Sequence, residues 1–288
     1  MTDHWRIADA IEATIGADGA ELCALRDRAG HDLLWDAGPL WPNHSPVLFP
    51  IVGQVAGDRI HVDGRAYELP RHGFARRRRF DWVERSATRC SLELRDDEPS
   101  RAVYPFPFHL LLTYRIEGDA LSVEYALTNP GSAELPAALG AHPAFRWPLR
   151  EGVQTDYRIE FETDEPAPIH RVADGLLDPA GLPSPVEGRV LRLDPALFVQ
   201  DAIIMLEPRS RSLRYVGPGG GLEFSWTGFP QLGLWQKPGA DFICVEPWHG
   251  YSSPAGWNGD LRDKPGMMLV RPGETRTFGW RVRPIDQA

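Results

Sequence analysis

The chain has 288 residues, of which 42% are hydrophobic and 25% charged, and its formal net charge is -9. These values fit a soluble globular protein with a sizeable core, and the negative charge disfavours nucleic acid, whose binding depends on Lys and Arg neutralising phosphates. No apolar run reaches the ~20 residues that cross a bilayer, and residues 1–16 lack the order of a signal peptide. We therefore expect a cytoplasmic protein with no membrane partner.

Short strand patterns, separated by Gly, Pro and Asp turns, recur along the chain. Residues 7–13 are the exception and could form a short helix. Residues 21–36, 80–97 and 108–131 each have the pattern of two strands joined by a turn. Further strand patterns follow in order at residues 157–162, 189–194, 202–207, 213–226, 232–238, 242–248, 266–273 and 275–284.

Many short strands with regular turns favour an antiparallel sandwich or barrel. No repeat period is evident, which disfavours a propeller. The glycine-rich run Gly217–Gly221 has no helix after it, so it predicts a hairpin turn and not a phosphate loop. The Pro- and Gly-rich residues 163–188 have strand patterns on both sides. We expect one all-β domain over residues 1–288.

Three scattered cysteines, with no CxxC pair, argue against a disulfide framework or a thiolate zinc site. Chemistry is indicated instead by titratable groups in three short stretches, near residues 72, 142 and 246. A zinc site made by His72, His142 and Glu246 is conceivable, because two histidines and a glutamate can bind zinc. We expect neither a metal nor a cofactor.

Glu246 follows an apolar pattern. If residues 242–246 form a strand, Glu246 shares one face with Phe242 and Cys244, and the opposite face is apolar too. Burial on both sides would raise the pKa of the carboxyl group toward the range of a general base. We expect Pro247 to end the strand and leave Glu246 at a sheet edge. The alternative is a structural ion pair with an arginine.

His142 has a similar setting. Alternation places Ala138, Gly140 and His142 on one face, where the small residues would leave room for a ligand beside the imidazole. Pro143 should end this strand as well. A satisfied core histidine is the alternative, and the pattern leaves both interpretations open.

His72 precedes Gly73, which permits a close backbone approach. Arg76 begins a run of four arginines and could point into a pocket to hold a hydroxyl or an anion. The other three, Arg77–Arg79, are expected to alternate on a strand, exposed to solvent.

The segments HGFAR (72–76), GAHPAF (140–145) and CVEPWHG (244–250), with SPVLFPIVG (45–53) upstream, occur in this order. Together they resemble the aldose 1-epimerase (galactose mutarotase) family, and more closely its LacX-like branch. The resemblance covers residues 19–284 and implies a large antiparallel β-supersandwich with an open sugar-binding cleft.

The resemblance also implies roles. Glu246 would be the general base that takes the proton of the C1 hydroxyl, and His142 the general acid that protonates the ring oxygen. One proton removed and one delivered suffice to open a hemiacetal ring, so no cofactor is needed.

Five further residues are implied to bind the sugar. His72 and Arg76 would bind and polarise it, Asp201 would hold hydroxyl groups, and Trp235 and Trp248 would form cleft walls. The expected partner is a small-molecule hexose or sugar phosphate, and the protein a monomer or homodimer.

Two alternatives stay open. The arginines near His72 motivate a hexose-6-phosphate epimerase. The same cleft would also suit a non-catalytic sugar-binding or sensor protein. Residues 41–50 do not match the Asn-Arg element with which better-studied mutarotases contact sugar, so the resemblance leaves the identity of the sugar open.

Overall fold

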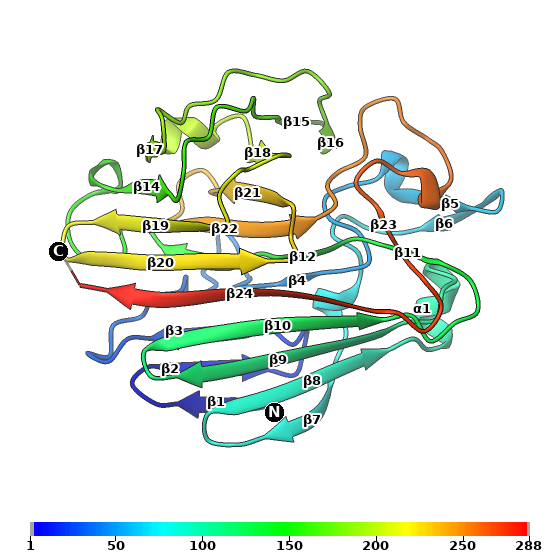
Figure 1. Cartoon of the computed structure of the whole chain (residues 1–288), viewed down its shortest axis with the longest axis horizontal. Helices are drawn as coiled ribbons and strands as arrows, with labels where there is room; N and C mark the ends of the chain where they lie inside the picture. The colour runs from blue at the N-terminus through cyan, green and yellow to red at the C-terminus, as the bar shows by residue number, and fades with distance from the viewer. Residues whose placement is uncertain (1–2, 287–288) are drawn as a thin grey trace.

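The computed structural model describes residues 3–286, and the architecture is the predicted all-β, antiparallel one (Figure 1). Its largest element is a nine-stranded sheet in the order β17-β14-β19-β20-β24-β10-β9-β8-β7. These strands are β7 (Asp81–Arg85), β8 (Arg89–Arg95), β9 (His109–Glu117), β10 (Ala120–Thr128), β14 (Arg158–Phe161), β17 (Val190–Arg192), β19 (Ser212–Gly217), β20 (Gly220–Thr227) and β24 (Thr275–Ile285).

A second sheet has the order β18-β21-β22-β12-β4, with β13 also paired to β22. Its strands are β4 (Val47–Leu48), β12 (Leu139–Ala141), β13 (Ala144–Arg146), β18 (Ile203–Met205), β21 (Gln231–Trp235) and β22 (Phe242–His249). In Figure 1, β22 lies in the middle of this sheet, behind the strands of the larger one. It is therefore covered by neighbours along both edges.

Smaller sheets complete the strand set. They are the sheet β1 (His4–Ala8), β2 (Glu12–Gly16), β3 (Leu22–Arg26) and the pairs β5 (Arg59–Val62) with β6 (Arg65–Glu68), β11 (Leu135–Ala137) with β23 (Met268–Val270), and β15 (Val172–Ala173) with β16 (Leu176–Leu177). Short 3-10 turns occur at Ala56–Asp58, Ala75–Arg77, Gln154–Asp156, Pro195–Phe198 and Leu261–Asp263. Within residues 3–286, no helix is long or apolar enough to span a bilayer.

The main core lies between the two large sheets. Phe145 of β13 meets Phe224 of β20 edge to face, with ring centroids 5.9 Å apart. Ile243 and Val245 of β22 belong to this core, whereas Cys244 belongs to a separate small cluster on the other face. The period-2 alternation of β22 therefore turns Glu246 away from the main core.

The predicted strand pairs at residues 80–97 and 108–131 are confirmed as β7–β8 and β9–β10, and Gly217–Gly221 makes the expected hairpin turn. The helix considered at residues 7–13 is wrong. β1 and β2 pair there with Ile7 opposite Ala13, and both side chains are fully buried. A strand at this spacing buries alternate side chains, and this burial outweighs the weak helical pattern of the segment.

The strand expected at Arg77–Arg79 is also wrong, because the chain makes a 3-10 turn at Ala75–Arg77. The backbone N–H groups of Phe74 and Ala75 both donate to the Phe49 carbonyl, which curls the segment against β4. A short helix, α1 (Glu98–Val103), had not been predicted. Its capping box between Asp97 and Ser100 was the available signal.

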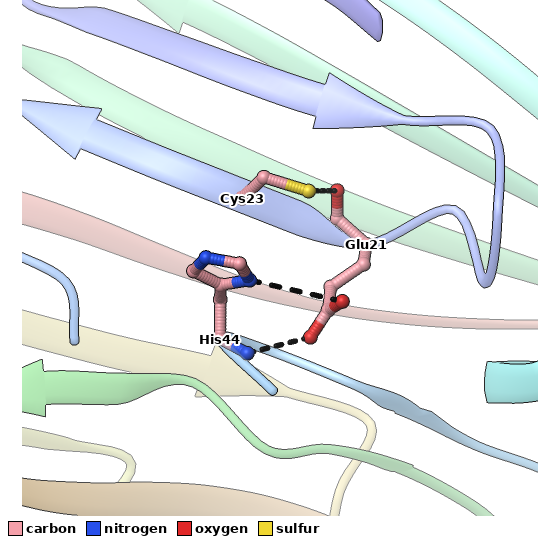
Figure 2. A group of neighbouring side chains, drawn as sticks. All are labelled: Glu21, Cys23 and His44. Atoms are coloured by element: carbon pink, nitrogen blue, oxygen red, sulfur yellow. Dashed lines mark hydrogen bonds and ion pairs between the residues drawn. The ribbon is translucent and has the colours of Figure 1, made fainter. Parts of the chain in front are cut away.

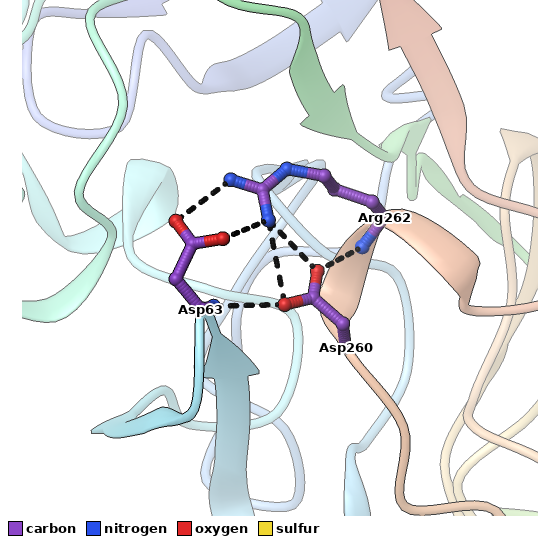
Figure 3. Close-up of polar contacts among 3 residues, drawn as sticks. All are labelled: Asp63, Asp260 and Arg262. Carbon is purple, nitrogen blue, oxygen red and sulfur yellow. Dashed lines mark hydrogen bonds and ion pairs between the residues drawn. The ribbon is translucent and has the colours of Figure 1, made fainter.

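An ion-pair cluster ties the β5–β6 hairpin to the loop after β22 (Figure 3). Both Arg262 terminal nitrogens donate to Asp63, at 2.8 and 3.1 Å, and Arg262 Nη1 also donates to Asp260 Oδ1 at 3.2 Å. The Asp63 N–H donates to Asp260 Oδ2 at 2.9 Å. The cluster thus anchors a loop that begins beside the candidate site.

Candidate active site

Glu246 lies in the interior of β22, opposite Gly233 of β21, and is 1% exposed. The predicted two-sided burial is confirmed, but the strand does not end at Pro247, which pairs with Leu232 before β22 continues to His249. The Val245 N–H donates to the Pro143 carbonyl, so the nitrogen of Pro247, two residues on, points to the same side. On that side β22 faces the break between β12 and β13, where no strand pairs with it. Proline has no N–H, so at this position the sheet loses no hydrogen bond.

That interruption positions His142. β12 ends at Ala141 and β13 begins at Ala144, so the strand stops before Pro143 as predicted. The irregular backbone brings His142 Nε2 to 3.2 Å from Glu246 Oε2. Two residues about one hundred positions apart in the sequence thus form a contacting carboxyl–imidazole pair, with His142 only 7% exposed.

The space that Gly140 leaves on its face of the strand is filled by Trp248. A Cβ atom on Gly140 would lie 2.7 Å from Trp248 Cδ1, and one on Gly233 would lie 2.4 Å from Trp248 Cη2. The Trp248 indole therefore lies across two glycines of neighbouring strands. The small residues serve to seat an aromatic wall, and the ligand space lies beyond it.

His72 is held by backbone strain and one hydrogen bond. It has a φ of 64°, and a Cβ on the following Gly73 would lie 2.2 Å from the Phe49 carbonyl oxygen, so only glycine fits there. The Gly53 N–H donates to His72 Nδ1 at 3.1 Å. A neutral His72 therefore carries its proton on Nε2, and its ring lies 5.8 Å from that of His142.

The seven residues singled out in the sequence come together. One cavity of about 160 Å³ is lined by Glu246, His142, His72, Arg76, Asp201, Trp235 and Trp248. They come from the second sheet, the break between β12 and β13, the segment from His72 to the 3-10 turn at Ala75–Arg77, and the turn before β18. The fold brings these seven residues together, and their individual roles stay predictions.

Sequence reasoning missed several lining residues, among them Trp41, Arg71 and Ser252. The Trp41 ring stacks on His142, with centroids 5.1 Å apart and planes 28° apart, and it meets Trp235 edge to face at 5.7 Å. Trp41 opens the segment that failed to match the family's Asn-Arg element. The only sequence feature that could have indicated Trp41 is the Trp-Pro pair at the start of this segment.

The two arginines of the cavity hydrogen-bond to neutral oxygens. Arg71 Nη2 donates to Gln54 Oε1 at 2.9 Å, and Arg76 Nη2 donates to the Arg71 carbonyl at 3.0 Å. Burial lowers the pKa of Arg76 from its ordinary value. Across residues 3–286, neither guanidinium has a carboxylate at ion-pair distance. Both are thus available to an anionic or hydroxyl-rich ligand.

Burial moves the titrating groups toward their neutral forms. It raises the pKa of Glu246 well above its ordinary value, and the nearby charge of Asp201 raises it further. It lowers the pKa of His142 to about 3, and the positive charge of Arg76 adds to this shift. Burial is also the main reason that the pKa of His72 lies well below its ordinary value. Both shifts thus favour the neutral forms, a carboxylic acid at Glu246 and an imidazole at His142.

Metal ligands are also present at this site. His142, Cys244 and Glu246 offer donor atoms within 4.8 Å of one another, while His72 is not part of that group. Burial raises the pKa of the Cys244 thiol well above its ordinary value. An ion there would occupy the imidazole nitrogen and carboxylate oxygen that proton transfer requires, so the two uses of the site exclude each other.

The sequence model of the family described as aldose 1-epimerase matches residues 3–278. The chain belongs to the aldose 1-epimerase family. Protein LacX of Lactococcus lactis subsp. lactis, in its plasmid form, is 33% identical over 284 residues, which is 93% of this chain and 94% of LacX. The family thus supports an epimerase-type isomerase acting on a small-molecule sugar.

Solved structures agree with this assignment. A galactose mutarotase related enzyme from Lactobacillus acidophilus is similar with a TM-score of 0.89 and 25% identity, over 99% of this chain and all of that one. A galactose mutarotase-like protein from Lactobacillus casei is similar with a TM-score of 0.89 and 26% identity, over 98% of this chain and all of that one. The expected galactose mutarotase-like sandwich and the LacX-like branch are both confirmed.

Proposed function

We propose that this protein is an aldose 1-epimerase that interconverts the α and β anomers of a hexose, with Glu246 and His142 as its acid/base pair. The observation that carries the proposal is the 3.2 Å between His142 Nε2 and Glu246 Oε2 at the wall of one cavity. The two oxygens that exchange protons in mutarotation, the C1 hydroxyl and the ring oxygen, are bonded to the same carbon. A contacting acid/base pair can therefore serve both.

The reaction needs the charged form of the pair, which differs from the neutral form by the position of one proton. Glu246 as carboxylate takes the C1 hydroxyl proton while His142 as imidazolium gives its proton to the ring oxygen. The bond between C1 and the ring oxygen breaks, and an open-chain aldehyde forms. After rotation about C1–C2 the ring closes on the other face of the carbonyl with the two roles exchanged. Protons balance without a cofactor or metal, and we propose that none is required.

The other lining residues would bind the sugar. His72 presents an Nε2–H donor because Gly53 occupies its Nδ1. Asp201 would accept hydroxyl protons, and its own Oδ1 accepts from the Ala202 N–H at 2.7 Å, which fixes the carboxylate. Trp235 and Trp248 would pack on the C–H faces of the ring. The family match from residue 3 to residue 278 supports a single domain.

The test is anomer exchange followed by NMR for freshly dissolved aldoses. We expect acceleration over buffer, and a loss of about 10²–10⁴-fold in rate for Glu246→Gln and for His142→Asn, the usual contribution of a positioned acid or base. Glu68→Gln is the matched control, because the Glu68 side chain is 84% exposed. The proposal fails if no aldose is accelerated. Sugar binding by calorimetry with unchanged anomer kinetics would indicate a binding or sensor protein instead.

A hexose-6-phosphate epimerase is the second candidate, and the two cavity arginines favour it. Arg71 and Arg76 present positive charge to the ligand space while bonding only neutral oxygens, and guanidinium groups bind phosphate in bidentate geometry. Under this proposal a hexose 6-phosphate has a higher kcat/KM than the free sugar, and Arg71→Gln removes the preference. A phosphate ester that is no better a substrate than the free sugar would rule it out.

A further inference from the structure

A second group of mixed donor atoms lies outside the cavity, where the β2–β3 turn meets the segment before β4 (Figure 2). It consists of Glu21, Cys23 and His44, whose Oε, Sγ and Nδ1 atoms lie within 4.8 Å of one another. Figure 2 shows the three side chains arranged around a common point. None of them lines the candidate active site.

The local hydrogen bonds hold the Glu21 carboxylate in place and leave other ligand atoms of the group unused. Glu21 Oε1 accepts the N–H groups of His44, at 2.7 Å, and Ser45, at 2.9 Å. Glu21 Oε2 lies 3.9 Å from His44 Nδ1, too far for a hydrogen bond. His44 Nδ1 is buried and, within the described part of the chain, has no hydrogen-bond partner. An imidazole nitrogen and a carboxylate oxygen thus face each other across a gap.

Cys23 completes the set with sulfur. Its Sγ donates a weak hydrogen bond to the Glu21 carbonyl at 3.3 Å. The Glu21 and His44 side chains are 20% and 23% exposed, so solvent reaches the group. Zn²⁺ binds thiolate, imidazole and carboxylate at about 2.0–2.3 Å. The donor atoms lie within 4.8 Å of one another, and binding would draw them closer together around the ion.

We propose that Glu21, Cys23 and His44 form a binding site for one divalent transition-metal ion of the Zn²⁺ class. The mixed sulfur, nitrogen and oxygen donors favour Zn²⁺ over the hard cations Mg²⁺ and Ca²⁺, which take oxygen ligands. Binding displaces the thiol proton of Cys23 to solvent, and a water completes the fourth position. The cysteines of the chain are far apart in sequence, and no metal-binding motif such as CxxC indicates this site.

The bound ion would join the β2–β3 turn to a segment of the chain that also reaches the cavity. The His44 carbonyl accepts the N–H of Ala144, the first residue of β13, at 2.9 Å. Trp41, three residues before His44, stacks on His142. The ion would therefore join the β2–β3 turn to the loop that presents Trp41. Metal binding itself does not depend on what the cavity catalyses.

The experiment is titration of the metal-free full chain with Zn²⁺ against a chromophoric chelator, and with Co²⁺ followed by its thiolate charge-transfer absorption. We expect one equivalent to bind with a Co²⁺–thiolate band. Replacing even an outer-shell partner of a metal costs about 10–100-fold in affinity, so Cys23→Ser should lose at least that much. Glu21→Gln should also weaken binding, although its amide oxygen can still accept the two backbone N–H groups.

Cys244→Ser is the matched control, because Cys244 belongs to the other donor group, with His142 and Glu246. It should bind Zn²⁺ and Co²⁺ as the unaltered chain does. Circular dichroism and thermal unfolding verify that each variant is folded. The proposal is overturned if no thiolate band forms, or if Cys23→Ser and Glu21→Gln, both folded, bind as tightly as the unaltered chain. Loss of binding in Cys244→Ser alone would overturn it too, by placing the metal at the group formed by His142, Cys244 and Glu246.

Discussion

Replacing Gly233 by alanine would push a methyl group against the Trp248 indole. The added Cβ would lie 2.4 Å from Cη2 and 2.5 Å from Cζ2, about 1 Å inside van der Waals contact. The other side of the indole is no freer, because Gly140 lies near Cδ1 in the same way. Trp248 is 5% exposed and must therefore move into the cavity or force β21 and β22 apart.

Overpacking of this kind costs about 1–3 kcal/mol. At about 2–4 °C per kcal/mol for a chain approaching this size, Tm should fall by ~2–12 °C. If Trp248 moves toward the ligand space, KM for the sugar should rise as well. Thermal unfolding by calorimetry and steady-state anomer kinetics measure the two effects on the same samples.

Two further variants make this test specific. Gly181→Ala is the matched control, because the nearest atom to its added Cβ lies 3.1 Å away on an exposed part of the chain. Trp248→Phe shortens the ring, so the double variant Gly233→Ala/Trp248→Phe should be more stable than the sum of the single effects predicts. An unchanged Tm and KM in Gly233→Ala, or strict additivity in the double variant, would refute the role given to the two glycines.

Two other variants test individual contacts. Trp41→Leu should lower kcat by about 2–12-fold through loss of a ring contact worth ~0.5–1.5 kcal/mol, whereas Trp41→Phe should retain most of the rate; equal rates for both variants would contradict a stacking role. Lys264 is 3% exposed, and burial lowers its pKa to about 7 from 10.5. Between these values the unfolded chain binds one more proton than the folded one, so this group makes stability rise with pH from 7 to 10.5 and adds no slope below 7. Urea unfolding from pH 7 to 9 should show a smaller rise for Lys264→Met than for the unaltered chain, and equal slopes would exclude Lys264 as the cause.

Local pattern was sufficient for much of the fold. The alternation in residues 108–131 predicted both strands and the turn between them, because a sheet buried on one face imposes a period of two. It failed at residues 7–13, where a short apolar run fits a helix and a strand equally well. It failed again at Arg77–Arg79, where the Phe49 carbonyl, distant in sequence, captures two backbone N–H groups.

For the candidate site, the sequence indicated which residues could do chemistry and, through the family resemblance, which chemistry to expect of them. Glu246 and His142 stood out because titratable groups are costly in apolar strands. Their 3.2 Å contact, however, depends on a break between β12 and β13 opposite the interior of β22. Strand order and register are set by the packing of the whole sheet, so no local pattern specifies them.

Trp41 and the wall made by Trp248 depend on tertiary structure for the same reason. In the sequence they are only a Trp-Pro pair outside the family motifs and two glycines in separate strands. Only the folded chain stacks the first tryptophan on His142 and lays the second across Gly140 and Gly233. The sequence by itself determined an antiparallel β fold of the aldose 1-epimerase type and singled out Glu246 and His142 as candidate acid/base residues. The tertiary structure decided which side chains surround them, because contacts between distant residues arise only when the sheets pack.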